Sequence, residues 1–436
     1  MKLDKYIDGV KQADLYKRYG KIKRVIGLMI ESVGPAVSIG NVCHIHTSIE
    51  TKILAEVVGF NDENVLLMPY SPINEISPGS LVEATNKPLT IKVGEGLIGK
   101  VVDAIGQPLD QSSLPRGLMN YTTEQLPPNP LVRPRILEPI EIGVKTIDSL
   151  LTVGKGQRVG IFAGSGVGKS TLLGMIARNS EADVNVIALI GERGREVREF
   201  IEKDLGPEGL KRSVVVVATS DQPALMRIKG AYTATAISEY FRDQGYNVNL
   251  MMDSVTRVAM AQREVGLATG EPPTTKGYPP SVFATLPKLL ERTGTSANGT
   301  ITAFYTVLVD GDDLNDPIAD TTRGILDGHF VLDRKLAEQG QFPAINVLKS
   351  ISRVMPQITS EEDQKLASKI RSHLSTYEEN YELIQIGAYK RGTSKVVDEA
   401  IQLHPKIISF LKQDIEENCS RQEAIEQMEQ ILYGGV

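Results

Sequence analysis

Residues 163–171 read Ala-Gly-Ser-Gly-Val-Gly-Lys-Ser-Thr, and this glycine-rich stretch decides the fold of the chain around it. The run before it, residues 158–162, is short and apolar, as a buried strand would be. After it, apolar residues recur at helical spacing from Leu172 to Ala177. A strand, a glycine-rich loop and a helix, with Gly-Lys-Ser at the turn, form a phosphate-binding loop.

Each position of this loop has an expected role in holding a nucleoside triphosphate. Backbone N–H groups of the glycine-rich segment close around the β- and γ-phosphates, helped by the positive end of the helix that follows. Lys169 adds a point charge, and the Ser170 hydroxyl is placed to ligate Mg²⁺. The usual pattern begins with glycine, and Ala163 is a small residue that fits in its place. The expected nucleotide-binding residues are Gly164, Ser165, Gly166, Val167, Gly168, Lys169, Ser170 and Thr171.

The composition is that of an ordinary soluble protein with two or three domains. The 436 residues are too many for one core, and 41% of them are hydrophobic and 23% charged. A net charge of −6 argues against a general nucleic-acid-binding protein, which usually carries a basic balance. No stretch approaches the ~20 apolar residues of a membrane span, and the chain lacks a signal-peptide pattern. We therefore expect a cytoplasmic protein with Cys43 and Cys419 as free thiols.

The N-terminal stretch differs in charge from the rest of the chain. Residues 1–24 hold eight Lys or Arg and three Asp, a local net charge of +5. Leu3, Ile7 and Val10 lie at helical spacing, so residues 1–22 predict a basic helical arm. Such an arm would contact an acidic partner or anionic lipid, or would simply be a solvated helix, and the sequence leaves both open.

Three domains are predicted beyond the arm. In residues 23–95, short β-branched runs broken by Gly, Pro and Asn predict a small β-barrel, with strands near 24–30, 42–46, 53–58, 65–68 and 81–83. In residues 96–355, apolar runs alternate with helical patterns, which predicts an α/β domain with a parallel sheet, and its strands lie near 158–162, 184–190, 213–219, 248–253 and 300–309.

Residues 356–436 predict a helical domain. Thr359 with Glu362 matches a capping-box pattern, as does Ser420 with Glu423. The apolar face of the first helix is expected to be core, and it comprises Leu366, Ile370, Leu374, Tyr377, Tyr381 and Ile384.

Hydrolysis of the nucleotide would need a carboxylate on the Mg²⁺ side and a group that orients water. Asp253 ends the apolar run 248–252, so its carboxylate is expected at the sheet edge beside the phosphate-binding loop. Glu192 ends another apolar run and could polarise the attacking water, although Glu196 and Glu199 are nearby alternatives on spacing alone.

A family resemblance appears in several further segments. The stretch 191–196, Gly-Glu-Arg-Gly-Arg-Glu, resembles the Gly-Glu-Arg motif of catalytic subunits in the F-type and V-type rotary ATPases. Residues 343–352, Pro-Ala-Ile-Asn-Val-Leu-Lys-Ser-Ile-Ser, match the ten-residue signature of that family, and residues 96–108 are similar to the segment that leads into its nucleotide domain. Residues 270–294 and 321–329 resemble the branch of protein-export ATPases of flagella and type III secretion. This chain has Asn346 in the ten-residue signature at the position where that branch usually has Asp.

The resemblance implies roles for three residues. Glu192 matches the family's water-activating glutamate, and Arg353 matches the arginine that one subunit donates into its neighbour's site. Phe342 matches an aromatic residue that packs on adenine. The expected catalytic residues are thus Lys169, Glu192 and Arg353, and the expected Mg²⁺ ligands are Ser170 and Asp253. Because one chain carries all of these, a homo-hexamer would build a complete site at every interface.

The resemblance also implies an architecture and a set of partners. It implies an N-terminal β-barrel, a RecA-like nucleotide domain and a C-terminal helical domain. The activity implied is ATP hydrolysis that energises type III protein export, with flagellar export favoured over a virulence injectisome. The implied partners are a regulatory, stator-like protein at the N-terminus, a central stalk protein, the export gate and chaperone–substrate complexes. The resemblance also implies that the protein is peripherally associated with the inner face of the cell membrane.

Three other functions are compatible with a phosphate-binding loop. A catalytic subunit of an ion-pumping synthase would work beside a non-catalytic partner, which the union of Glu192 and Arg353 in one chain disfavours. A hexameric RNA translocase is disfavoured by the acidic balance and by the 5% aromatic content, which leaves few stacking residues. A regulatory subunit that holds nucleotide without turnover is disfavoured by Glu192.

Overall fold

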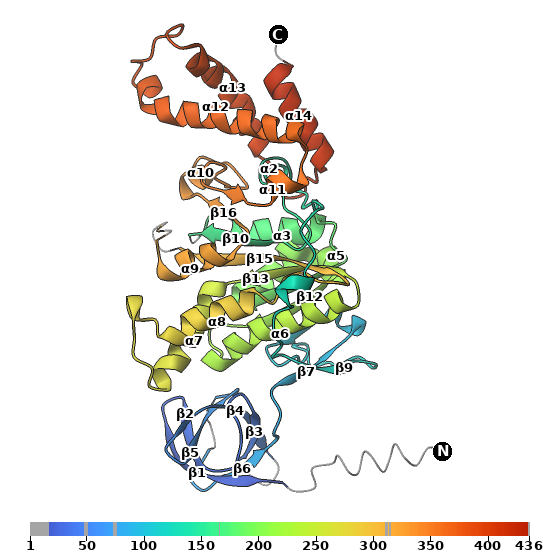
Figure 1. Cartoon of the computed structure of the whole chain (residues 1–436), viewed down its shortest axis with the longest axis vertical. Helices are drawn as coiled ribbons and strands as arrows, with labels where there is room; N and C mark the ends of the chain where they lie inside the picture. The colour runs from blue at the N-terminus through green and yellow to red at the C-terminus, as the bar shows by residue number, and fades with distance from the viewer. Residues whose placement is uncertain are drawn as a thin grey trace, which may run out of the picture.

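The computed structural model describes residues 17–47, 51–72, 76–164, 166–309, 313 and 315–434. A β-barrel lies at one end of an elongated molecule, an α/β domain lies in the middle, and a helical domain with the C-terminus lies at the other end (Figure 1). The expected fold class is confirmed. The helix expected in the N-terminal arm falls largely on residues 1–16, which are outside the described residues, as is Ser165.

Six antiparallel strands close the barrel in the order β1-β2-β5-β4-β3-β6. They are β1 (Tyr19–Ile26), β2 (Met29–Val33), β3 (Val42–His46), β4 (Lys52–Asn61), β5 (Asn64–Pro69) and β6 (Leu81–Ala84). Ile30, Ile45 and Leu67 are fully buried in its core. The single strand expected over residues 24–30 is a hairpin instead, because Gly27 has a φ of +55° and turns the chain there.

The barrel also takes residues that the sequence assigned to the arm. β1 starts at Tyr19, and it pairs with both β2 and β6. The basic residues of the N-terminal stretch are part of this barrel wall: Lys17 Nζ lies 2.6 Å from Glu83 Oε1, and Arg24 Nη2 lies 2.7 Å from Glu31 Oε1. Residues 1–16 contain three Lys and three Asp, so the local charge of +5 belongs to the start of the barrel.

The middle domain is built on a twisted, mostly parallel sheet in the order β17-β16-β10-β15-β13-β11-β12-β8, with β14 paired to β15. Its strands are β8 (Val101–Asp103), β10 (Arg158–Ala163), β11 (Val184–Ile190), β12 (Ser213–Ala218), β13 (Asn247–Asp253), β14 (Gly294–Thr295), β15 (Thr300–Leu308), β16 (Gly328–Leu332) and β17 (Ile351–Ser352). The central strands are almost entirely buried, as their apolar runs predicted.

Helices cover both faces of this sheet (Figure 1). They are α2 (Lys145–Leu150), α3 (Lys169–Asn179), α4 (Gly194–Glu199), the π-helical turn η3 (Phe200–Leu205), α5 (Gly206–Lys211), α6 (Ala224–Asp243), α7 (Val255–Ala268), α8 (Pro280–Leu290), α9 (Pro317–Ile325) and α10 (Arg334–Glu338). The connection from the barrel contains a two-stranded ribbon of β7 (Thr90–Val93) and β9 (Met119–Thr122), with short turns η1 (Glu95–Leu97), η2 (Pro130–Val132) and η4 (Thr275–Gly277) elsewhere.

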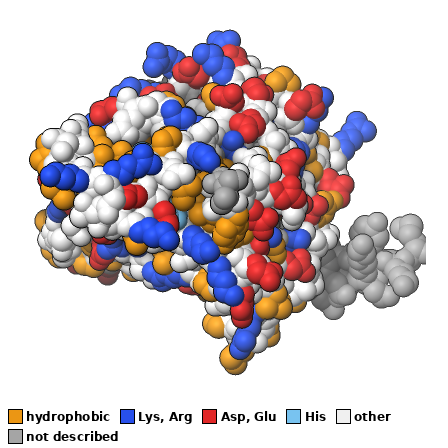
Figure 2. Space-filling model, turned by 90° about the horizontal axis from the view of Figure 1, so that it is seen from above, with side chains coloured by type: hydrophobic (Ala, Val, Ile, Leu, Met, Phe, Trp, Pro, Cys, Tyr) orange, Lys and Arg blue, Asp and Glu red, His pale blue; other side chains and the backbone are white. Residues whose placement is uncertain are grey.

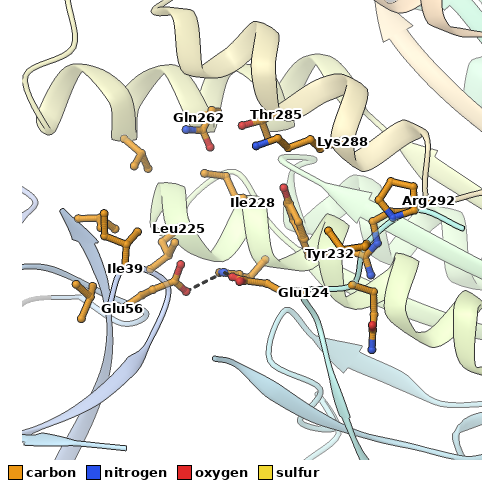
Figure 3. Close-up of a pocket in the computed structure, with 17 residues that line it drawn as sticks. Ile39, Glu56, Glu124, Leu225, Ile228, Tyr232, Gln262, Thr285, Lys288 and Arg292 are labelled. Atoms are coloured by element: carbon orange, nitrogen blue, oxygen red, sulfur yellow. Dashed lines mark hydrogen bonds and ion pairs between the residues drawn. The ribbon is translucent and has the colours of Figure 1, made fainter. Parts of the chain in front are cut away.

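A cavity of about 460 Å³ lies between the barrel and the middle domain, and buried ion pairs cross beside it (Figure 3). Lys229 on α6 places Nζ 2.8 Å from Glu56 Oε2 on the barrel and 3.0 Å from Glu124 Oε1 on the connection. Next to it, the fully buried Arg292 pairs with Glu239 at 2.6 Å. Of these pairs, Lys229–Glu56 joins the barrel to the middle domain, and removing one partner of such a buried pair costs on the order of 3–5 kcal/mol.

The helical domain consists of α11 (Met355–Ile358), α12 (Glu361–Gln385), α13 (Lys395–Leu411) and α14 (Arg421–Tyr433). Ser420 and Glu423 form the expected capping box. The other expected box does not form: Ser360 and not Thr359 is the N-cap of α12 and accepts from Asp363 N, while the Thr359 hydroxyl donates to the Met355 carbonyl. Only the first half of the apolar face of α12 is core, because Tyr381 is 44% exposed.

Both cysteines are free and buried. Within the described residues, no helix combines the length and apolar character needed to cross a membrane.

Candidate active site

The predicted site residues other than Arg353 lie at the edge of the sheet where the parallel strands end. The phosphate-binding loop follows β10, Glu192 follows β11 after one glycine, and Asp253 is the last residue of β13. In the sheet, β15 and β13 lie between β10 and β11, so the segments after all four parallel strands lie at the same edge. Ligands of open α/β sheets bind outside the carboxyl ends of the strands.

The loop itself has the backbone that its glycines allow. Gly166 has a φ of +77° and Gly168 a φ of +89°, a left-handed region that residues with a Cβ avoid. Gly168 is the N-cap of α3, whose first residue is Lys169, and no side chain caps this helix end. Its free N–H groups and the positive end of the helix dipole therefore face the loop, as phosphate binding requires.

Lys169 is the centre of a buried charge cluster. Its Nζ lies 2.6 Å from Asp253 Oδ1 and 3.5 Å from Glu192 Oε1. Thr306 on β15 donates to the same Asp253 oxygen at 2.8 Å. The Asp253 side chain is only 4% exposed, so the three charged groups lie in a low-dielectric pocket at the end of the sheet.

Burial and mutual repulsion set the protonation of this cluster. Burial opposes the charge on Lys169, but the carboxylates of Asp253 and Glu192 outweigh it and raise the lysine pKa. Burial, together with the nearby Asp253 charge, raises the pKa of Glu192 to about 7, and a hydrogen bond with Glu196 adds to the rise. A glutamate with a pKa near 7 is suited to accept a proton from water at neutral pH.

The donor set at this position fits Mg²⁺. The Asp253 carboxylate and the half-buried Ser170 hydroxyl are hard oxygen ligands of the kind that Mg²⁺ prefers. The cluster holds two carboxylates against one lysine, which favours a further cation beside it. Among the described residues, no group of three or more His, Cys, Asp or Glu forms a metal cage. A site of one carboxylate, one hydroxyl and substrate phosphates is the usual arrangement for Mg²⁺ in such proteins.

Two other predicted binding residues, Phe342 and Thr171, differ in what they contact. Phe342 lies beside the loop, because a Cβ built on Gly168 would be 3.5 Å from its ring, and its side chain is 46% exposed. It is therefore free to pack against a ligand. Thr171 lies beside Asp204: burial raises the pKa of the Asp204 carboxyl, and the Thr171 side chain opposes that rise.

Arg353 lies at the opposite end of the sheet. Its backbone N–H donates to Asp327 O at 3.0 Å, and Asp327 N–H donates to Arg158 O, at the start of β10. Ala163 lies five residue steps along β10 from Arg158, a span of about 16 Å at the usual rise of a strand. The exposed Arg353 side chain thus lies beyond reach of Lys169 in the same chain.

The structure adds two residues that the sequence reasoning missed. Thr306, a polar residue in the apolar run of β15, anchors Asp253. Arg257 on α7 packs against Gly191, since a Cβ on that glycine would lie 2.7 Å from the arginine side chain. Its buried Nε has no hydrogen-bond partner in the described part of the chain. An arginine four residues after Asp253 was the only sequence signal for it.

Comparisons with known proteins agree with this geometry. The model of the ATP synthase alpha/beta family, nucleotide-binding domain, matches residues 143–352. The beta-barrel domain model of the same family matches residues 22–86, and the T3SS EscN ATPase C-terminal domain matches residues 359–430.

Relatives and solved structures cover nearly the whole chain. A "Flagellum-specific ATP synthase" of Bacillus subtilis is 68% identical over 427 residues, 98% of each chain. A "Type 3 secretion system ATPase" of Xanthomonas euvesicatoria is 49% identical, over 94% of this chain and 93% of that protein. The assembled ATPase EscN from the enteropathogenic E. coli type III secretion system has a TM-score of 0.90 at 46% identity, over 95% of this chain and 100% of EscN. EscN in complex with its central stalk EscO gives a TM-score of 0.88 at 45% identity, over the same shares of the two chains.

Proposed function

This chain belongs to the ATP synthase alpha/beta family and is a P-loop ATPase of its flagellar and type III secretion branch, and we propose that it hydrolyses MgATP as a homo-hexameric ring that energises flagellar protein export. The observation that carries the proposal is the buried cluster of Lys169, Glu192 and Asp253 at the end of the phosphate-binding loop. A protein that only held nucleotide would have no need of a second buried carboxylate with a raised pKa.

The reaction follows from the positions of these side chains. Water attacks the γ-phosphorus, Glu192 accepts the proton that the water loses, and the bond to the β–γ bridging oxygen breaks to release ADP and phosphate. Lys169 leaves its contact with Asp253 for the phosphates and offsets their negative charge. Mg²⁺, held by Ser170 and Asp253, would screen the phosphate oxygens. Phe342 packs on the adenine ring.

Arg353 completes the site from a neighbouring copy. The distance between Arg353 and Lys169 within one chain supports a role in trans, because the two residues lie near opposite ends of β10. An arginine that reaches a transferring phosphoryl group accelerates hydrolysis by a factor on the order of 10³–10⁵. Since every copy carries both halves, a homo-hexamer has one complete site at each interface. The assembled state of EscN supports a ring.

We assign the partners to the two ends of the elongated molecule. EscN binds its central stalk EscO, and we place the equivalent stalk of this chain at the helical end of the ring. Viewed from that end, hydrophobic side chains are exposed among both basic and acidic ones (Figure 2). Exposed apolar residues near the end of α12 and the start of α13 include Leu383, Ile386 and Val396. The export gate and chaperone–substrate complexes approach the same end. A stator-like regulator contacts the N-terminal arm, and the inner face of the membrane contacts the basic residues at the start of the barrel.

Hydrolysis is tested with Glu192→Gln and Lys169→Ala. Glutamine keeps the shape of Glu192 but cannot take up a proton, so the variant should bind MgATP normally and release phosphate at least about 100-fold more slowly. Lys169→Ala should lose binding as well. Wild-type phosphate release from Glu192→Gln would transfer the role to Glu196 or another group.

Flagellar export is tested by expressing the chain in a motile bacterium that lacks its own flagellar export ATPase. We expect motility to return, and the 68% identity to the Bacillus subtilis protein makes that species the natural host. Restored secretion in an injectisome mutant, without restored motility, would favour the virulence system instead.

A further inference from the structure

The loop between α13 and α14, residues 412–420, joins the helical domain to the nucleotide domain. Gln413, at its start, is only 5% exposed. Its Oε1 accepts a hydrogen bond from Lys145 N at 2.8 Å, and its Nε2 donates to Gly143 O at 2.8 Å and to Glu417 O at 2.9 Å. One buried side chain therefore ties this loop to the segment that opens α2, which lies against the base of α14 (Figure 1).

The backbone of Gln413 contacts Phe342, the residue that is proposed to pack on the adenine base. Gln413 N–H donates to Phe342 O at 2.9 Å. Two residues further on, the Ile415 carbonyl accepts from Arg178 Nη2 at 2.9 Å. Arg178 is near the end of α3, the helix that begins at Lys169. The α13–α14 loop is thus hydrogen-bonded to Phe342, beside the start of α3, and to Arg178, near the end of α3.

Two apolar side chains are exposed in this region, beside the exposed charged residues Lys412, Asp414 and Glu416. Phe342 is 46% exposed and Ile415 is 49% exposed, although each has its backbone held by a neighbouring element. Apolar side chains on a fixed backbone suit a flat, weakly polar ligand, which a purine base is and a phosphate is not.

We propose that Gln413 is a positioning residue for the purine base: its side chain fixes the α13–α14 loop so that the Gln413 N–H holds Phe342 in place beside the phosphate-binding loop. This inference rests on the proposed packing of Phe342 on adenine. Gln413 itself touches no nucleotide. Through it, a movement of the helical domain would change the affinity for the base without altering the phosphate contacts.

The test compares ATP with inorganic triphosphate, which has the phosphates but no base. In Gln413→Ala three hydrogen bonds are lost, so we expect KM for ATP to rise about tenfold with kcat within about twofold of wild type. The inhibition constant of Mg-triphosphate should stay within about twofold. Phe342→Ala should behave alike, and the double variant should be no worse than Phe342→Ala alone, because the two residues act through one contact.

Two further variants separate positioning from general destabilisation. Ser420→Ala removes the cap of α14 in the same loop, which costs about 1 kcal/mol, yet should leave KM for ATP unchanged. If Gln413→Ala does not fold, Gln413→Glu keeps the length and the Lys145 contact but cannot donate to Gly143 and Glu417.

Each result decides between the two claims. An unchanged KM in the Gln413 variants beside a raised KM in Phe342→Ala would overturn the role of Gln413. The same holds if ATP and triphosphate weaken equally, or if the two substitutions are additive. A Phe342→Ala variant with unchanged KM for ATP would instead contradict the proposed base contact.

Discussion

At the scale of single residues, the site is governed by how its charges are paired. Lys169 faces two carboxylates, Asp253 at 2.6 Å and Glu192 at 3.5 Å, and burial prevents water from screening their repulsion. The cost falls on Glu192, whose pKa is raised to about 7. In contrast, Asn346 has no catalytic contact: its Nδ2 donates to Asp333 and its Oδ1 accepts from Lys349 N, a turn that explains its tolerance in place of the usual Asp.

The raised pKa of Glu192 predicts a pH dependence. Below pH 7 the carboxyl is increasingly protonated and cannot accept a proton, so kcat/KM should fall as the pH is lowered through about 7. Glu196→Gln removes a neighbour that raises the pKa of Glu192, and this acid limb should move to lower pH by up to about one unit. Glu199→Gln is the matched control, because Glu199 pairs with Lys203 instead. An acid limb that stays in place in Glu196→Gln would contradict Glu192 as the titrating group.

At the scale of elements, the turn after β11 aims Glu192 at the site. Gly191 makes this turn with a φ of +73°, and its N–H donates to Ala218 O at 2.7 Å on the neighbouring strand. A side chain here would be strained and would also collide with Arg257. The absence of a side chain at Gly191 therefore lets Arg257 on α7 pack against the turn that carries Glu192.

Gly191→Ala should accordingly lower both stability and turnover. The left-handed backbone costs about 1–2 kcal/mol for alanine, and the added Cβ lies 2.7 Å from Arg257 Cβ. We expect a lower melting temperature and a fall in kcat larger than the change in nucleotide affinity. Gly194→Ala is the control, since no atom lies within 4 Å of its added Cβ and the position is helical. Equal behaviour of the two variants would mean that the turn does not position Glu192.

At the scale of the whole molecule, local patterns were predictable and contacts between distant segments were not. The apolar runs of the sheet and the Gly-Lys-Ser turn are local signals, so the strands and the loop could be read from the sequence. The role of Gln413 could not, because its partners Gly143 and Lys145 are 270 and 268 residues away. The start of β1 was missed for a similar reason: Tyr19 and Gly20 pair with β6, which is about 60 residues further along the chain.

The barrel also changes what the N-terminal arm is expected to do. Deleting residues 2–16 leaves β1 intact and removes equal numbers of Lys and Asp. ATP binding should persist, and binding of a stator-like partner should weaken through loss of the apolar stripe. Salt-sensitive binding to anionic vesicles should be unchanged, because the exposed basic residues Lys21 and Lys23 remain on β1.

Vesicle co-sedimentation at two salt concentrations checks this assignment. Reversing Lys21 and Lys23 to Glu in the full chain should remove the salt-sensitive part of binding. If the deletion removes it instead, the arm and not the barrel wall carries the charge interaction.

The central claim is that two chains build each active site, and mixing two inactive variants tests it most directly. Arg353→Ala should bind nucleotide but lose most turnover, and Lys169→Ala should lose binding. In mixed rings, about one interface in four joins an intact Lys169 from one variant to an intact Arg353 from the other, and neither homogeneous ring has such an interface. We predict that phosphate release returns on mixing, up to about a quarter of the wild-type rate, and that wild-type specific activity rises with protein concentration as rings form. Verified mixed rings that stay inactive, together with concentration-independent activity in a proven monomer, would contradict it.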